Sequence, residues 1–259
     1  MPIAIPASKN LTLGKGELHF ALFAAGTQNP LGERLLGNCP EFTMNREAET
    51  IDHFSSMRGR KLLDDQSTLG ITTAGTISCD DVDPANLAMH FLGTSGILTV
   101  GSATGVVNTF VGVTPGLQYQ LGTTASAPSG ARKVTAVVVR EGATVAVEGV
   151  DYDVDLNLAR VTPLAGGMFA AGDTMAITFN ISSSTRTTII SADELIEGTL
   201  RFVSYNPKGI PVDYFFPWVK IQPNGDIPLI TEEFMTVPLK ITALSKGSLA
   251  QLYADGKVV

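Results

Sequence analysis

The sequence predicts a mainly β protein. Val, Ile, Thr and Phe, which favour strands, are abundant, and stretches with long helical periodicity are scarce. The 26 glycines and 14 prolines indicate many turns. With 259 residues, the chain can form one large β domain or two domains, and either arrangement buries a sizeable core.

The charge balance and the lack of long apolar runs limit the kinds of partner to expect. Charged residues make up 17% of the chain, and the net charge is −7. A protein that grips duplex nucleic acid needs clustered Lys and Arg, so this balance argues against such a protein. Residues 1–6 lack the pattern of a secretion signal, and no apolar run approaches the roughly 18 residues of a membrane span. We therefore expect a soluble protein that is made in the cytoplasm, without membrane contact.

After a first alternating strand that ends near residue 23, residues 39–51 predict a strand with one acidic face. Glu41, Glu47 and Glu49 fall on that face, because successive side chains of a strand point to opposite sides. The other face carries Phe42 and Met44 and is apolar enough to pack. Residues 70–79 predict the returning strand of a hairpin.

Between these strands, residues 52–69 are too long for a tight turn, and we expect a long loop. A flexible solvated loop is one interpretation. Its exposed apolar residues cost solubility unless they dock on another surface, and its alternating charges would make such docking specific. The residues of this arm are Phe54, Met57, Arg58, Arg60, Lys61, Leu62, Leu63, Asp64, Asp65 and Leu69.

The two cysteines, Cys39 and Cys79, lie one on each strand of the hairpin. Pairing position 39 with 79 places Thr50 opposite Thr68 and makes the thiols cross-strand neighbours. A disulfide is possible, but two cysteines are no disulfide framework, and two small buried apolar residues are the favoured interpretation.

One helix is predicted over residues 84–92. Asp83 is a good N-cap, Pro84 takes the first helical position, and Gly93 is a natural C′ stop. Leu87, Phe91 and Leu92 form an apolar stripe, which we expect to cover one face of a sheet.

Residues 97–185 predict a separate small β-sandwich. Short Val-, Thr- and Ala-rich runs alternate there with Gly-Pro turns, and the flanks have the composition of linkers. We interpret this module as an insertion in a discontinuous core domain of residues 1–96 and 186–259. Long strands follow, and Pro217 and Pro238 are expected to push two of them to sheet edges.

Residue patterns typical of catalysis and metal binding are missing. His19, His53 and His90 lack metal-ligand spacing, and no nucleotide-binding or nucleophile motif occurs. Residues 151–157 resemble a calcium loop, but Leu156 stands at its glycine position, so a solvated strand is favoured. We expect no cofactor, no metal and no enzyme activity. The aromatic residues 214–218 are expected to form a core or interface strand.

Residues 34–42 and 47–56 resemble the tail tube proteins of bacteriophages with long, non-contractile tails. The Asp80-Asp81 and Asn86-Leu87-Ala88 segments and the turn at residues 206–209 add to this resemblance, which covers about residues 14–96 and 196–256.

The resemblance implies a β-sandwich with a flanking helix and a long hairpin arm. Subunits of that family form hexameric rings, four strands of each join an inter-subunit β-barrel, and the rings stack into a tube in the virion tail, assembled in the host bacterium. Glu41, Glu47 and Glu49 would line an acidic lumen through which DNA passes without specific binding, and the arm would contact neighbouring subunits and rings. Tape measure and tail terminator proteins are the further partners implied. Residues 97–185 depart from the minimal family pattern and would lie on the outer surface.

Two alternatives stay open. The chain is an adhesin or carbohydrate-binding module if residues 97–185 and the cluster around Trp218 recognise a ligand. An enzyme ranks third, because the sequence offers no set of acid, base and nucleophile.

Overall fold

The structure is a computed structural model that describes residues 11–257, apart from the side chain of Arg58. It confirms the mainly β class, with several antiparallel sheets and one short α-helix among the described residues. The chain divides into two compact units. The first unit takes the chain up to Ser95 and from Ile189 onwards, and the second is Gly96–Thr188. The expected module boundaries, residues 97 and 185, fall just inside the second unit. Residues 1–6, on which the expected lack of a secretion signal rests, lie outside the described part.

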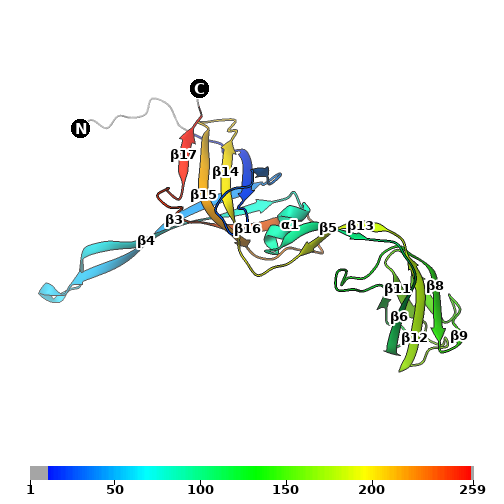
Figure 1. The fold of residues 1–259 in the computed structure, drawn as a ribbon. Coiled ribbons are helices and arrows are strands. Elements are labelled where there is room, and N and C mark those ends of the chain that lie inside the picture. Colours follow the sequence, from blue (N-terminus) through cyan, green and yellow to red (C-terminus); the bar gives the residue numbers. More distant parts are fainter. Residues whose placement is uncertain (1–10, 258–259) are drawn as a thin grey trace. The chain divides into compact units, whose positions relative to one another are not determined.

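The first unit is built on one eight-stranded sheet, whose main path runs β2-β1-β14-β15-β16-β4-β3 with all neighbours antiparallel, while β17 pairs with β15 (Figure 1). The strands are β1 (Gly16–Leu22), β2 (Arg34–Leu35), β3 (Glu41–Ser55), β4 (Leu62–Cys79), β14 (Ile196–Ser204), β15 (Val212–Pro223), β16 (Val237–Ala243) and β17 (Tyr253–Gly256).

This sheet curls around its own core. The ring of Phe42 in β3 lies 5.8 Å from that of Phe202 in β14, although three strands separate β3 from β14 in the sheet order. Phe42 also meets the fully buried Phe216 edge-on, at 6.4 Å. Strands from both ends of the sheet therefore pack around one hydrophobic cluster. The base of the β3–β4 hairpin packs against this cluster through Phe42.

The two prolines do not mark sheet edges, so that prediction was wrong. Pro217 lies in β15, between the residues that pair with β17 and those that pair with β16, and at a register shift opposite β14. A proline is tolerated there because the ladder is interrupted at that point. Pro238 lies in β16 opposite Ser78 of β4. It lies one residue before Leu239, where the pairing of β16 with β15 starts.

Helix α1 (Pro84–His90) begins as the sequence predicts and ends differently. The Asp83 carboxylate accepts a hydrogen bond from the backbone N–H of Asn86 at 2.7 Å, and proline starts the first turn. At the other end Leu92, not Gly93, takes the left-handed conformation, with a φ of 53°. Gly93 follows it and donates to the carbonyl of Ala88 at 2.8 Å. Glycine is needed there because a Cβ would collide with the backbone of Ile190.

The predicted apolar stripe of α1 was also wrong in part. The helix packs on β15 and β16, but its buried face consists of Asn86, Ala88, Met89 and His90. Leu87 is half-buried against the core, whereas Phe91 is 42% exposed. Polar side chains turn inwards because each has a partner there. The ring nitrogen Nδ1 of His90 lies 3.0 Å from the carbonyl oxygen of Pro238.

In the second unit, a four-stranded sheet (β6-β12-β8-β9) and a three-stranded sheet (β10-β11-β7) share one buried cluster that includes Val139, Tyr152 and Phe179. The short Val-, Thr- and Ala-rich runs of the sequence form strands here, as expected. The bounds are β6 (Ala103–Val113), β7 (Tyr119–Gln120), β8 (Val134–Glu141), β9 (Thr144–Val145), β10 (Tyr152–Asp155), β11 (Arg160–Pro163) and β12 (Asp173–Ile181). A two-stranded ladder of β5 (Thr94–Val100) and β13 (Ser184–Ile190) connects the two units along the chain.

Candidate assembly surfaces

The arm of residues 52–69 is not a loop but the outer part of the hairpin. β3 continues to Ser55 and β4 begins at Leu62, so only residues 56–61, with the short 3-10 helix Met57–Gly59, connect them. Two extra residues on β4, Leu69 and Asp64, interrupt the pairing as bulges. Thr50 lies opposite Thr68, as the sequence predicts. Both faces of this part of the hairpin are exposed, so its strands carry many charges and lack the alternation of apolar residues that indicates a strand.

The outer part of the hairpin has two open edges. β16 pairs with β4 only over Thr73–Cys79, and β3 has no neighbour other than β4 in the sheet order. Residues 47–55 and 62–72, which we call the distal ribbon, therefore form a two-stranded ladder beyond the rest of the sheet. Figure 1 shows this ribbon projecting from the first unit in pale blue and cyan. Within the described residues, the outward N–H and C=O groups of both its strands face no third strand.

The three predicted carboxylates lie on one exposed face of the hairpin. Glu41, Glu47 and Glu49 stand on the same side of β3, and their partners in β4 are Ser78, Thr72 and Gly70. This stretch of the face holds no Lys or Arg. Lys240 is the nearest cation in register, because it pairs with Thr76 and Thr76 pairs with Thr43. The face thus has three carboxylates and one ammonium group at its border.

Exposed apolar side chains gather towards the tip. Phe54 lies opposite Leu63 on one face of the ribbon, and Met57 at the tip is 75% exposed. Leu62 and Leu69 are exposed as well. Charges alternate with them: Arg60 and Lys61 are exposed, and His53 pairs with Asp64. The tip thus combines an apolar surface with cations, as docking on another surface requires.

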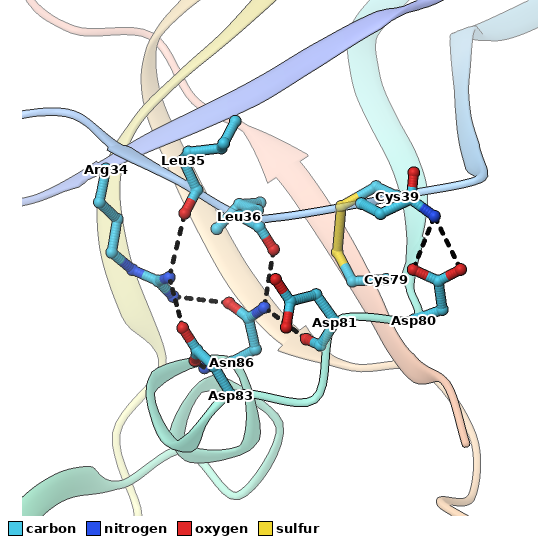
Figure 2. Close-up of a disulfide and its surroundings, with 10 residues drawn as sticks. Arg34, Leu35, Leu36, Cys39, Cys79, Asp80, Asp81, Asp83 and Asn86 are labelled. Carbon is cyan, nitrogen blue, oxygen red and sulfur yellow. Dashed lines mark hydrogen bonds and ion pairs between the residues drawn. A yellow bond between two sulfur atoms is a disulfide. The ribbon is translucent and has the colours of Figure 1, made fainter. Parts of the chain in front are cut away.

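A disulfide closes the base of the hairpin, which corrects the favoured interpretation of two separate thiols. Cys39 and Cys79 are bonded, and their Cα atoms are 4.0 Å apart (Figure 2). Beside them, Asn38 Nδ2 donates to both carboxylate oxygens of Asp80, at 2.8 and 2.7 Å. The sequence brought the two cysteines into register but contained no signal that decides between thiols and a bond.

Asn86 of α1 fastens the segment that precedes β3. Its Oδ1 accepts from Arg34 at 2.8 Å, and its Nδ2 donates to the carbonyls of Leu36 and Asp81 at 2.8 and 2.9 Å (Figure 2). Burial lowers the pKa of the Arg34 guanidinium, and the Asp83 carboxylate at 3.8 Å opposes that shift. Sequence reasoning placed these residues in two separate motifs. The structure joins them into one clamp.

The remaining candidate residues have structural roles. Asp151 accepts hydrogen bonds from the backbone of Val147 and Met168, at 2.8 Å each, as a turn-stabilising carboxylate does. The guanidinium of Arg201 covers one face of Phe215 at 4.6 Å, and the indole N–H of Trp218 donates to Glu197 at 2.9 Å, so both aromatic residues have partners within the chain. No cluster of metal-ligating side chains occurs in the described part of the chain.

Desolvation raises the pKa of Glu141 in the second unit, and the charge and hydrogen bond of Asp173 raise it further. Burial also raises the pKa of Tyr152, with a smaller contribution from Glu148. These shifts follow from neighbouring carboxylates and packing, and they bring no acid, base and nucleophile together.

The family described as "Protein of unknown function UCP028589" matches residues 11–251 of the chain, which span both units. No curated protein matches the chain. None of the helices in residues 11–257 is long and apolar enough to cross a membrane.

Replacing Asn86 with Ala tests the clamp. The substitution leaves the buried carbonyl of Leu36, the part-buried carbonyl of Asp81 and the Arg34 guanidinium without this partner. We therefore expect the free energy of unfolding to fall by about 2–3 kcal/mol. Urea unfolding followed by circular dichroism measures this. Asn29→Ala, at an exposed position, is the matched control and should change little. Equal stabilities of the two variants would contradict the role of Asn86.

The disulfide is tested by Cys39→Ala/Cys79→Ala. A cross-link between positions 40 residues apart restricts the unfolded chain, and its loss should lower the free energy of unfolding by about 3–4 kcal/mol. Reductant should destabilise the wild-type protein by a similar amount and leave the double variant unchanged. A wild-type protein insensitive to reductant would show that the bond contributes nothing.

Proposed function

We propose that this chain, which belongs to the UCP028589 family, is a structural subunit that assembles with copies of itself into stacked rings. The assembly is a tube of the kind that conducts DNA in the tails of non-contractile bacteriophages. The observation that carries this proposal is the β3–β4 hairpin, which combines the two open edges of the distal ribbon, an acidic face and a tip with exposed apolar and cationic side chains.

The ribbon makes poor sense in an isolated subunit. A two-stranded ladder alone is marginally stable in water, and unpaired strand edges invite association. Here the edges extend along residues 47–55 and 62–72, and large apolar side chains are exposed on the same segment. Copies that pair along these edges remove both problems. An inter-subunit barrel built from such hairpins leaves no edge open, because a closed sheet has none.

The acidic face suits a lumen. Glu41, Glu47 and Glu49 project from one side of β3, and a ring repeats them in every subunit. A lining of one sign repels a polyanion over about 8–10 Å at physiological ionic strength, so DNA passes without being held. Lys240 at the border reduces this field but does not reverse it, with one positive charge against three negative charges.

The other parts of the proposal rest on the resemblance. They are a β-sandwich core with its flanking helix, six subunits in a ring, a place in the virion tail after assembly in the host cytoplasm, and contacts with tape measure and terminator proteins. The second unit has its own core. We assign it to the outer surface of the tube, where an additional module does not obstruct the lumen.

Charge reversal tests the lumen. In particles that carry Glu41→Lys/Glu47→Lys/Glu49→Lys, we expect DNA delivery to fall by at least about tenfold, because a cationic lining binds the phosphate backbone. Infectivity per assembled particle is the measurement. Glu148→Lys/Glu232→Lys/Glu233→Lys makes the same change of charge at exposed positions elsewhere and should deliver normally. Normal delivery by the first variant would count against a lumen at this face.

Shortening the hairpin tests self-assembly. We replace residues 56–61 with Asn-Gly, a two-residue turn that keeps Ser55 and Leu62 paired. Electron microscopy of concentrated wild-type protein should show rings or tubes, whereas the variant should fold but fail to lengthen. Leu229→Ser/Ile230→Ser removes exposed apolar surface elsewhere in the first unit and should leave tubes intact. A wild-type protein that stays monomeric at every concentration would refute the proposal.

A further inference from the structure

We propose that the hairpin tip of one copy docks in a cleft of the next copy. In the sheet order of each copy, this cleft lies at the end opposite the hairpin. The inference rests on the proposed function and names the surface that receives the arm. The hairpin ends the sheet at β3 and β4, whereas the cleft lies beside β1 and β2 at the other end.

The cleft lies within the first unit and is large and mainly apolar. It has a volume of about 970 Å³ and is enclosed by the end of β1, residues 23–32, helix α1 and residues 192–197. Leu31 is 70% exposed in it, and Leu22 and Leu195 are exposed there as well. Exposed leucines that surround a hollow favour an apolar occupant, because such an occupant removes them from water.

The charges of the cleft are complementary to those of the tip. Glu194 lines the cleft and Asp193 adjoins it, both exposed. The other two charged residues of the lining are engaged within the chain: Arg34 with Asn86, and Glu197 with Trp218 and Lys220. Lys246, beside the lining, donates to the carbonyl of Gln28 and lies over the ring of Phe23. The rim therefore offers two exposed carboxylates, Asp193 and Glu194, to a cationic occupant.

The tip carries Met57 and Leu62 together with exposed Arg60 and Lys61. The carboxylates next to them are engaged within the hairpin, because Asp64 pairs with His53 and Asp65 accepts from the backbone N–H of Gln66. Its methionine and leucine suit the apolar walls, and its cations suit the acidic rim. Each of the two surfaces thus presents what the other lacks, as at specific interfaces with an apolar centre and a charged border.

The topology of this contact explains why copies continue to add. The donor and the acceptor are different patches of one chain, so the contact is heterologous. Such contacts generate closed rings or open helical filaments rather than two-fold dimers, because the two end copies of a growing chain keep an unused donor and an unused acceptor until the assembly closes. A tube subunit requires this kind of contact.

Cross-linking between copies tests the docking. Met57→Cys protein is mixed with size-tagged Leu31→Cys protein under conditions in which wild-type protein assembles, and a bis-maleimide is added. The native cysteines are bonded to each other and should not react. Docking raises the local thiol concentration, so we expect at least about tenfold more heterodimer than from Met57→Cys with Phe234→Cys, whose second position is 97% exposed in the first unit. Leu195→Cys provides a second acceptor position.

A charge swap provides the second test. Arg60→Glu/Lys61→Glu should raise the protein concentration needed for assembly by at least about tenfold, because it places like charges together. Adding Asp193→Lys/Glu194→Lys to that variant should restore assembly. Tubes that form without the tip-to-cleft cross-link, or a combined variant no better than the first, would overturn the docking and leave the tube subunit intact. A failure of the wild-type protein to assemble would overturn both.

Discussion

The structure depends on one constraint: the distal ribbon exposes strand edges that no third strand of residues 11–257 pairs. Backbone N–H and C=O groups along residues 47–55 and 62–72 face outwards from both strands, where only water or another chain can satisfy them. Natural proteins usually protect long edges with a bulge, a proline or inward-pointing charge. Here both bulges fall on β4, whose residues 62–72 form one of the two open edges, whereas β3 runs unbroken for 15 residues. The edge of β3 therefore lacks the protection that a bulge or a proline gives.

The base of the hairpin shows how such an element is held by one copy. Phe42 inserts between rings from β14 and β15, the Cys39–Cys79 bond joins the segment before β3 to the end of β4, and Asn86 connects that segment to the helix. A ribbon that projects from the sheet needs a rigidly held base, because a mobile base would let its outer end sample many directions. The polar clamp and the disulfide supply that rigidity where the apolar core ends.

Much of the fold followed from local sequence, and the errors have physical causes. Asp83 and the short Val-, Thr- and Ala-rich runs of the second unit predicted elements correctly, because capping, strand propensity and turn formation act within a few residues. The arm at residues 52–69 was missed as a strand because a ribbon exposed on both faces needs no apolar alternation. Pro217 was misplaced because its tolerance depends on where three neighbouring strands begin and end. Likewise, the reason for glycine at position 93 was misjudged, because the backbone of Ile190 that crowds Gly93 belongs to a segment distant in sequence. In the candidate site, the acidic face was readable from β3 alone, whereas the cleft is assembled from four separate segments and has no sequence signal.

Hydrogen exchange of the ribbon's backbone amides, measured in dilute and in concentrated protein, tests this account most directly. We expect amides within residues 47–55 and 62–72 to exchange rapidly in the dilute protein and to become protected as copies assemble, while the amides of β14 and β15 change little. Protection of the ribbon that is the same at every concentration would show that a single copy satisfies its own edges, and the account would then be wrong.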